Sequence, residues 1–278
     1  MKVAVLGSGN GGLSCAFELA QKGREVRLFD FDSFGEQIDA VAREGGIWAN
    51  GKIAGFAPVA YSGHDIEQAL DGVDLVMAVG PAFATPAQGE ACRGLLKAGM
   101  AVIVCPSSCA GSLTFIQSAG IASDDGVIVG ETSTLPYAVR ISGPAAVNVY
   151  HRLTGGLYLA AVPREDTDKL LEMVADVWPL QRADSIFQTT LQNGNPVIHP
   201  AVSLLNAGAI DRGGEFLFYE EGVTEGVGKL IEAVDAERLA IAESLGVHIL
   251  SEPALGVTQE YMLEDNYSTG YSKAPGFL

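Results

Sequence analysis

The first half of the chain alternates short apolar runs with segments of helical spacing. Two strands are predicted at Val3–Leu6 and Val26–Phe29, and apolar residues recur at helical spacing between them, from Leu13 to Ala20. Later runs are almost continuously apolar, as expected for parallel strands that are covered on both faces of a sheet. These runs are Asp74–Val79, Ala101–Cys105 and Val127–Gly130.

Three further segments are predicted as strands outside this central set. Trp48–Ile53 contains Asn50-Gly51, the dipeptide most typical of a tight hairpin. Val147–Tyr150 and Tyr158–Val162 have the pattern of edge or antiparallel strands.

After about Pro163 helical patterns replace the alternation. Helices are predicted at Asp166–Val177, Pro200–Ala209 and Thr224–Leu245. The last of them carries one apolar stripe, formed by Val227, Leu230, Ile231, Val234, Ile241 and Leu245. The fold class is therefore predicted as α/β. A Rossmann-like, doubly wound parallel sheet in residues 1–164 is followed by an all-helical second domain in residues 165–278.

Composition supports an ordered globular protein. The 278 residues are 48% hydrophobic and 18% charged, and they are enough for two domains with substantial cores. The net charge of −17 argues against a nucleic-acid or anionic-membrane surface, because both need clustered cations. The chain opens directly on a strand, and no run approaches about 18 apolar residues, so neither a secretory leader nor a membrane span is predicted.

The four cysteines are interpreted as structural thiols. Cys105 and Cys109 have a C-x-x-x-C spacing, but no histidine or second pair completes a metal site around them. Cys15 and Cys92 stand alone. We therefore expect no metal and a reduced, cytoplasmic protein.

The turn Gly7-Ser8-Gly9-Asn10-Gly11-Gly12 fits G-x-G-x-x-G, between a predicted strand and a predicted helix. Gly7 allows the tight turn, Gly9 allows a pyrophosphate to approach the backbone, and Gly12 allows the helix to pack on the strand. The free N–H groups of the helix start would hold the phosphates. The cofactor contacts predicted from this turn are Gly7, Gly9, Asn10, Gly11 and Gly12.

Asp30 ends the second predicted strand, 18 residues after Gly12. A carboxylate at this position accepts hydrogen bonds from the adenosine ribose. No Arg or Lys lies between Asp30 and Arg43, so no nearby cation would neutralise the 2′-phosphate of NADP. The sequence favours NAD over NADP; the alternative is a Rossmann-like core that binds no nucleotide.

His199 is the candidate catalytic residue. Asn195-Pro196 and His199-Pro200 each resemble a helix N-cap followed by proline. Pro200 has no N–H for the carbonyl of Pro196, so we expect the helix to start afresh or kink at His199. The helix dipole would lower the pKa of this imidazole and a neighbouring carboxylate would raise it, a balance suited to proton transfer near neutral pH. On the residues alone, a packed core histidine remains the alternative.

Four motifs together resemble the opine dehydrogenases, the octopine/nopaline dehydrogenase family. They are GSGNGG at Gly7–Gly12, GETST at Gly130–Thr134, NGNPVIHP at Asn193–Pro200 and EGVTEGVGKLIEAVDAERLAIAESLGV at Glu221–Val247. The first is shared by many dehydrogenases, whereas the third and the helix after it are much more specific. The resemblance covers nearly the whole chain. It implies an NAD(P)H-dependent enzyme that reductively joins the amino group of an amino acid to a 2-oxo acid.

The resemblance also implies site residues. His199 would be the acid/base, and the loop at Glu131, Thr132 and Ser133 would face the cleft between the domains and contact substrate. The loop that begins at Pro106 would lie by the nicotinamide. The remaining assignments are Asn195 to the substrate and Pro81 to the cofactor.

One departure from the family concerns the partner of the histidine. The resemblance implies an aspartate partner from a later Glu-Asp element of the helical domain. Glu264-Asp265 lies earlier than that element, and Leu278 falls in what looks like the middle of the domain. We therefore expect a truncated or shortened chain that lacks the C-terminal part of the family.

Two other functions stay open. One is a 2-oxo or keto reductase of the ketopantoate reductase or glycerol-3-phosphate dehydrogenase kind. Such enzymes commonly use a lysine in the helical domain, and no lysine lies between Lys169 and Lys229. The other is a dinucleotide-binding protein without turnover. The sequence specifies neither the amino acid nor the 2-oxo acid, and a homodimer is among the oligomeric states it allows.

Overall fold

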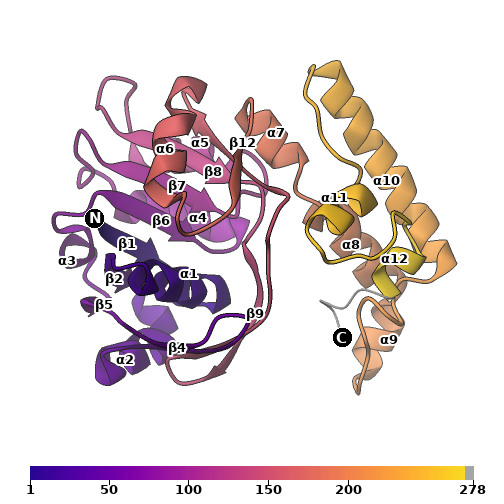
Figure 1. Cartoon of the computed structure of the whole chain (residues 1–278), viewed down its shortest axis with the longest axis horizontal. Coiled ribbons are helices and arrows are strands. Elements are labelled where there is room, and N and C mark those ends of the chain that lie inside the picture. Colours follow the sequence, from indigo (N-terminus) through magenta and orange to yellow (C-terminus); the bar gives the residue numbers. More distant parts are fainter. Residues whose placement is uncertain (273–278) are drawn as a thin grey trace.

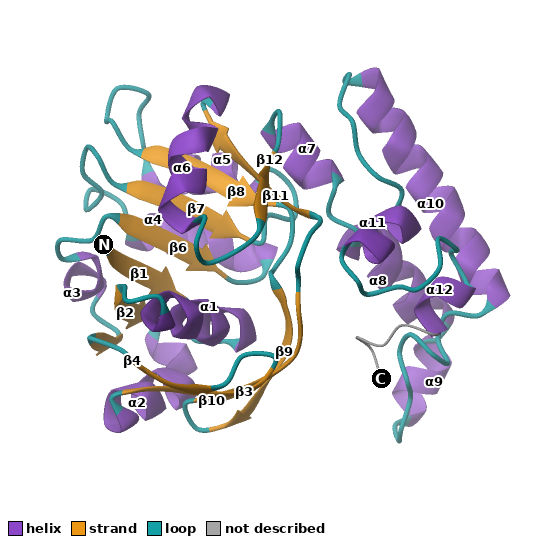
Figure 2. Ribbon diagram, viewed as in Figure 1, coloured by secondary structure: helices purple, strands orange, loops and turns teal. Residues whose placement is uncertain are grey.

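The structure is a computed structural model, and it describes residues 1–272. An α/β part that contains the N-terminus lies beside a helical part formed by the last helices (Figure 1). The parallel strands in the centre of the α/β part end on the side that faces the helical part (Figure 2). None of the helices in residues 1–272 is long and apolar enough to cross a membrane.

The α/β part is built on an eight-stranded sheet. In order across the sheet, the strands are β12 (Leu180–Arg182), β11 (Leu157–Val162), β8 (Ile128–Thr132), β7 (Ala101–Cys105), β6 (Leu75–Val79), β1 (Lys2–Leu6), β2 (Glu25–Phe29) and β5 (Tyr61–Gly63). The six strands from β8 to β5 are parallel, and β11 runs antiparallel to β8. The chain winds outward from β1 in both directions, so the predicted doubly wound fold is confirmed.

Both faces of this sheet are covered, which explains why its strands are apolar at every position. Val3 and Val5 of β1 enter one core cluster, while Ala4 and Leu6 enter the core on the opposite face. The helices of the α/β part are α1 (Asn10–Gln21), α2 (Gly35–Glu44), α3 (Ile66–Leu70), α4 (Thr85–Ala91), α5 (Gly111–Ala119), α6 (Thr167–Val174) and α7 (Ile186–Leu191). Short 3₁₀ turns lie at Asp32–Phe34, Ala82–Ala84 and Arg164–Asp166.

A second, four-stranded sheet packs on the outer side of α1. Its strands, in order, are β4 (Gly55–Pro58), β3 (Gly46–Gly51), β10 (Ala146–Arg152) and β9 (Tyr137–Gly143). The predicted hairpin is present as the antiparallel pair β3 and β4, but Ala49 pairs with Gly55, so its loop is longer than a two-residue turn. Because α1 lies between two sheets, even Glu18 is buried, where it accepts hydrogen bonds from Tyr137 and Trp178.

The main sheet continues past residue 165, where the sequence analysis places the second domain. After that point α6 packs on β11, β12 pairs with β11, and α7 also packs on β11. The next helix, α8 (Asn195–Leu205), packs on α10 (Glu225–Ser244) instead. We therefore propose a boundary between α7 and α8, near Gln192.

The helical part has its own apolar core between α8 and α10. Its other helices are α9 (Ala207–Arg212), α11 (Glu252–Thr258) and α12 (Thr269–Ser272). The prediction of a helix at Thr224–Leu245 is confirmed, because α10 runs from Glu225 to Ser244. The Thr224 hydroxyl caps this helix by accepting a hydrogen bond from the Val227 N–H at 3.3 Å.

The apolar stripe predicted for α10 is only half right. Val227 and Ile231 are buried, whereas Ile241 is 51% exposed. Val234 and Leu245 of the same stripe are also exposed. The side chains that take the buried positions in the middle of the helix are Asp235 and Arg238.

The helix start predicted at His199 is wrong. α8 begins at Asn195 and runs through Pro200, so His199 is its fifth residue. Pro200 lies close to the helix start and removes one hydrogen bond there. The buried face of α8 against the core of the helical part offsets that loss, and it consists of Val197, Ile198, Ala201 and Val202.

Candidate active site

The glycine turn between β1 and α1 has the geometry that a dinucleotide needs. Gly7 has φ +114°, and a Cβ on it would lie 2.1 Å from the Val79 carbonyl oxygen. A Cβ on Gly12 would lie 1.8 Å from the Gly7 oxygen, whereas a Cβ on Gly9 would meet no atom within 4 Å. No side chain caps α1, so the first N–H groups of the helix face the open space above Gly9. The turn therefore fits a pyrophosphate.

Asp30 lies beside this turn, at the end of β2. Its Oδ2 accepts hydrogen bonds from the Ser8 N–H at 2.6 Å and the Ser8 hydroxyl at 2.7 Å, and its Oδ1 accepts one from the Phe31 N–H. Nδ1 of His64 lies 2.7 Å from the Asp30 carbonyl oxygen. The carboxylate is thus held at the position where a ribose would bind.

The other residues assigned to the cofactor have different surroundings. Oδ1 of Asn10 accepts a hydrogen bond from the Ile141 N–H at 2.7 Å, which ties α1 to β9. A Cβ on Gly11 would lie 2.9 Å from the Leu135 side chain, so Gly11 makes room for that residue. Pro81 is exposed after β6, and Pro106 lines the cavity described next.

A cavity of about 990 Å³ lies between the α/β part and the helical part. Its walls come from β9 with the segment before it, from α8, from residues 216–219 and from α11 with the loop after it. Apolar and aromatic side chains dominate the lining, among them Leu135, Ile198, Phe216, Phe218, Leu255, Tyr261, Met262 and Tyr271. Within the described residues the lining contains one arginine, one histidine and one carboxylate: Arg140, His199 and Glu252.

The structure places His199 in this cavity with a tyrosine as its partner. Nε2 of His199 lies 2.8 Å from the Tyr219 hydroxyl. Burial lowers the pKa of His199 from its ordinary value, and burial together with the nearby Glu252 carboxyl raises the pKa of Tyr219 to about 12. The imidazole is therefore neutral at pH 7 and the phenol keeps its proton. The sequence analysis expected a balance between a helix dipole and a neighbouring carboxylate, whereas in the structure the pKa is lowered by burial.

The carboxylate expected beside His199 is not the group that contacts it. Among residues 1–272, the hydrogen-bond partner of the His199 ring is Tyr219. Glu264 and Asp265 are exposed, and the Glu264 carboxylate accepts a hydrogen bond from the Thr269 hydroxyl at 2.7 Å. No sequence signal marked Tyr219, because the segment that carries it shows neither helical nor strand periodicity.

The expected contact of the loop at Glu131, Thr132 and Ser133 with substrate stays a prediction, and in the structure none of these three side chains is part of the cavity lining. All three are buried at the end of β8, which pairs with β7 on one side and β11 on the other. The Thr132 hydroxyl donates to the Thr134 carbonyl, and the Ser133 hydroxyl accepts a hydrogen bond from the Tyr158 N–H. The next two residues, Thr134 and Leu135, line the cavity in their place.

Glu131 has a structural setting that we call the Glu131 clamp. Its carboxylate accepts hydrogen bonds from the Ser112 N–H at 2.9 Å, the Ser112 hydroxyl at 2.6 Å and the Thr189 hydroxyl at 2.6 Å. The Thr190 hydroxyl adds a longer contact of 3.4 Å. The clamp joins β8 to α5 and α7 inside the protein.

The segment before His199 is fixed to the α/β part. The Asn193 side chain donates to the Ser107 carbonyl at 3.0 Å, and its Oδ1 accepts a hydrogen bond from the Asn195 N–H at the start of α8. This links α8 to the loop after β7, which contains Pro106. Asn195 itself is exposed and lines the cavity, where the sequence analysis places the substrate.

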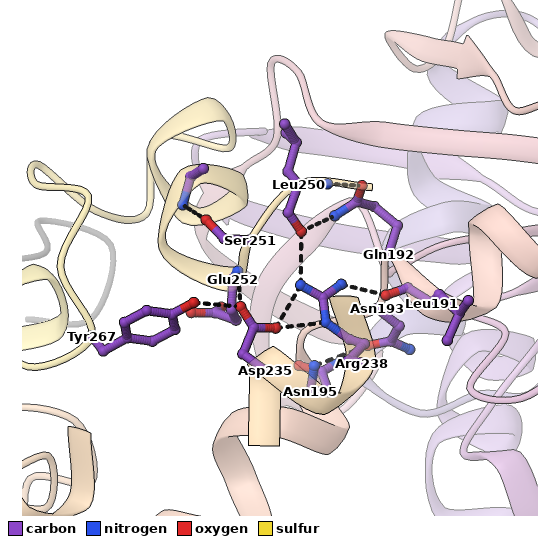
Figure 3. Close-up of polar contacts among 11 residues, drawn as sticks. Leu191, Gln192, Asn193, Asn195, Asp235, Arg238, Leu250, Ser251, Glu252 and Tyr267 are labelled. Carbon is purple, nitrogen blue, oxygen red and sulfur yellow. Dashed lines mark hydrogen bonds and ion pairs between the residues drawn. The ribbon is translucent and has the colours of Figure 1, made fainter. Parts of the chain in front are cut away.

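A buried ion pair on α10 fixes the position of α11 (Figure 3). Nη2 of Arg238 lies 2.6 Å from Oδ1 of Asp235. The Arg238 guanidinium also donates to the carbonyls of Leu191 and Leu250. Asp235 accepts hydrogen bonds from the Glu252 N–H at 2.8 Å and the Tyr267 hydroxyl at 2.7 Å. The pair therefore sets where α11 begins and where the Glu252 side chain enters the cavity.

Glu252 is the functional candidate that the sequence analysis missed. It is 4% exposed, and its Oε2 has no hydrogen-bond partner within residues 1–272. Burial and the nearby Asp235 raise its pKa to about 8, although Arg238 opposes them. In the sequence it follows Ser251 and precedes Pro253, so it reads as an ordinary acidic residue in the first turn of a helix.

In residues 1–272 no cluster of three or more His, Cys, Asp or Glu side chains is arranged to hold a metal ion. Within residues 1–272 the cavity lining contains no lysine, the residue that a keto reductase of the rival class would place there.

Known proteins resemble both parts of the chain. The model of the NAD/NADP octopine/nopaline dehydrogenase α-helical domain matches residues 182–274, and the model of the NAD-dependent glycerol-3-phosphate dehydrogenase N-terminus matches residues 2–107. An opine dehydrogenase from Arthrobacter sp. (strain 1C) is 34% identical over 250 residues, which are 89% of this chain and 69% of that protein.

Solved structures share the fold. An octopine dehydrogenase in complex with NADH and agmatine has a TM-score of 0.80 at 19% identity, covering 100% of this chain and 75% of that chain. A yersinopine dehydrogenase without ligand has a TM-score of 0.74 at 16% identity, covering 96% of this chain and 68% of that one. The fold and the matched domains define an NAD(P)-dependent dehydrogenase, and NAD is the supported cofactor. The chain belongs to the opine dehydrogenase family, so the resemblance inferred from its motifs is confirmed.

Proposed function

We propose that the protein is an opine dehydrogenase that uses NADH to condense an amino acid with a 2-oxo acid. The observation that carries the proposal is the cavity beside the nucleotide-binding part, in which a neutral histidine lies with one arginine and one buried carboxyl. Solved structures of octopine dehydrogenase hold NADH with agmatine, L-arginine or pyruvate, which supports the same substrate classes here.

His199 would move the protons of the reaction. The amine attacks the keto carbon, the oxygen leaves as water after it gains protons, and the resulting imine carbon is reduced by hydride, which NADH supplies when bound. A neutral imidazole can take a proton from the ammonium group of the amino acid, which frees the lone pair for attack, and can pass the protons lost by the nitrogen to the departing oxygen. The Tyr219 hydroxyl at 2.8 Å holds the ring in place for both transfers.

Arg140 would bind carboxylate groups, which both substrates carry. It projects from β9 at the exposed side of the cavity and contributes to the electrostatic surroundings of Tyr219. A guanidinium matches the two oxygens of a carboxylate. Asn195, at the start of α8, would add a polar contact to the same substrates.

The cofactor would bind across the glycine turn. Gly7, Gly9, Asn10, Gly11 and Gly12 form that turn, Asp30 would accept the ribose hydroxyls, and Pro81 and Pro106 follow β6 and β7 on the nicotinamide side. The carboxylate of Asp30 would repel the 2′-phosphate of NADPH, so we expect a preference for NADH.

We also propose a cytoplasmic protein. All four cysteines are free thiols, which fits a reducing compartment. A homodimer stays a prediction.

The decisive experiment measures NADH oxidation with pyruvate or 2-oxoglutarate across a panel of amino acids. The proposal expects oxidation that requires both substrates and a secondary-amine product detected by mass spectrometry. Oxidation with a 2-oxo acid alone would favour the keto-reductase alternative. No oxidation with any pair, in a protein that binds NADH, would favour binding without turnover.

A further inference from the structure

Two of the buried polar atoms without partners line the same cavity. Within residues 1–272 these atoms are Oε2 of Glu252, Oη of Tyr271 and Nε of Arg24, and the first two belong to the cavity lining. Buried polar groups in proteins are nearly always hydrogen-bonded, so an unpaired carboxyl oxygen in a cavity indicates a group that a ligand completes.

The surroundings of Glu252 hold the residue in place without giving its Oε2 a hydrogen-bond donor among residues 1–272. Its backbone N–H is held by Asp235, and the Arg238 guanidinium is occupied by Asp235 and by the carbonyls of Leu191 and Leu250. Gly194, before α8, leaves the space that the carboxyl fills, because a Cβ there would lie 3.0 Å from Glu252 Oε1. Tyr219 is the titratable group facing it from the segment after α9.

We propose that Glu252 binds the protonated amino group of the amino-acid substrate, which rests on the function proposed above. Arg140, the arginine of the cavity lining, would bind the substrate carboxylate, so the two ends of an amino acid would have separate binding residues. Apolar side chains that line the same cavity, such as Ile198 and Leu255, fit a substrate with an apolar side chain.

Binding has a defined proton balance. Below pH 8 the empty site holds a neutral carboxyl, because its pKa is about 8. When an ammonium group binds, the carboxyl loses its proton to solvent and the two charges pair. Above pH 8 the carboxylate is already ionised, and no proton is released. Uptake of an ammonium-bearing ligand below pH 8 should therefore release protons in an amount that falls as pH rises.

The test compares L-leucine with 4-methylpentanoate, which has the same skeleton without the amino group. Calorimetry on the protein with NADH gives both affinities for wild type, for Glu252→Gln and for Glu237→Gln. Glu237 is exposed on α10, so its substitution makes the same charge change away from the cavity. We expect wild type and Glu237→Gln to prefer L-leucine about 10- to 100-fold, the size of one hydrogen bond to a charged group. Glu252→Gln should lose that preference and keep its affinity for NADH.

A second measurement does not depend on the choice of amino acid. Above pH 8, methylammonium chloride should raise the melting temperature of wild type more than the same concentration of sodium chloride does. The extra stabilisation should be absent in Glu252→Gln.

Each result decides the assignment. A preference for L-leucine that survives in Glu252→Gln overturns it. If neither carboxylate ligand binds to wild type, the methylammonium comparison decides alone, and an equal effect of the two salts overturns it. Failure of the opine dehydrogenase proposal shows separately, as absent NADH oxidation in a protein that methylammonium still stabilises through Glu252.

Discussion

Two buried glutamates in this protein have opposite surroundings. In the Glu131 clamp, both carboxylate oxygens accept hydrogen bonds from α5 and α7, and the side chain is 0% exposed. Glu252 is 4% exposed, yet its Oε2 has no partner in the described part of the chain. Hydrogen-bond donors lower the free energy of a buried carboxylate, whereas burial of a carboxylate without donors is unfavourable.

Burial of an acidic residue is therefore a weak guide to its role, and satisfaction of its oxygens is a better one. The fully bonded Glu131 joins secondary-structure elements inside the α/β part. The incompletely bonded Glu252 lines the cavity beside His199 and has a pKa of about 8. Natural proteins retain a buried carboxyl with an unpaired oxygen, despite its unfavourable free energy, mainly where function requires it.

The largest expected effect is on the pH dependence of stability at Glu252. Its pKa is raised from an ordinary 4.5 to about 8, so the native state holds the proton more tightly than the unfolded state. The unfolding free energy should therefore fall as pH rises from about 4.5 to about 8, by up to about 5 kcal/mol at 1.36 kcal/mol per pH unit. Glu252→Gln should lose this fall. Urea unfolding of both proteins across that range measures it, and parallel curves would show that Glu252 is as well satisfied as Glu131.

The next largest expected effect is on the turnover number, and it concerns His199, which lines the same cavity as Glu252. His199→Ala should lower the turnover number roughly 10²–10⁴-fold, because it removes the proposed proton carrier. Affinity for NADH should hardly change, since the glycine turn lies in the other part of the molecule. His248→Ala, at an exposed position, is the matched control. Normal turnover together with a lowered melting temperature would make His199 a packed residue.

Glu131→Ala should instead act on stability. It removes the acceptor of the buried Ser112 N–H and hydroxyl and one of two acceptors of the Thr189 hydroxyl, which should lower the unfolding free energy by roughly 3 kcal/mol. Turnover of the remaining folded protein, at saturating substrates, should stay within about twofold. Glu90→Ala, on the exposed side of α4, controls for the loss of a surface carboxylate. A loss of turnover without a loss of stability would return Glu131 to the substrate site.

The smallest expected effect concerns Asp30, whose carboxylate is well hydrogen-bonded like that of Glu131 but is assigned to the cofactor. It tests whether a fully bonded carboxylate can also have a binding role. Replacing Asp30 by Ser and Phe31 by Arg should shift the ratio of NADPH to NADH affinity by about tenfold, or about 1.4 kcal/mol. Fluorescence titration of both nucleotides measures the ratio. Equal or tighter NADPH binding by the unmodified protein would contradict the role of Asp30.

Local patterns predicted the elements that local physics decides. The apolar strands, the glycine turn and the capped helix α10 follow from runs of residues that contact one another or the backbone nearby. Pro200 shows where such reasoning fails. A local rule predicted a break at His199, but packing of the apolar face of α8 outweighed the single lost hydrogen bond.

The sequence by itself determined the central apolar strands, the long helix α10, the nucleotide-binding turn and the choice of His199 as candidate. Only the tertiary structure decided that Tyr219 is its partner, that Glu131 lies inside the protein and that Glu252 lies in the cavity. These outcomes depend on contacts between residues far apart in the chain, such as Asp235 with the Glu252 N–H and Glu131 with Thr189. The helices and strands that pack around a buried carboxyl determine whether it has hydrogen-bond donors. The spacing of residues within one segment of the sequence contains no information about that packing.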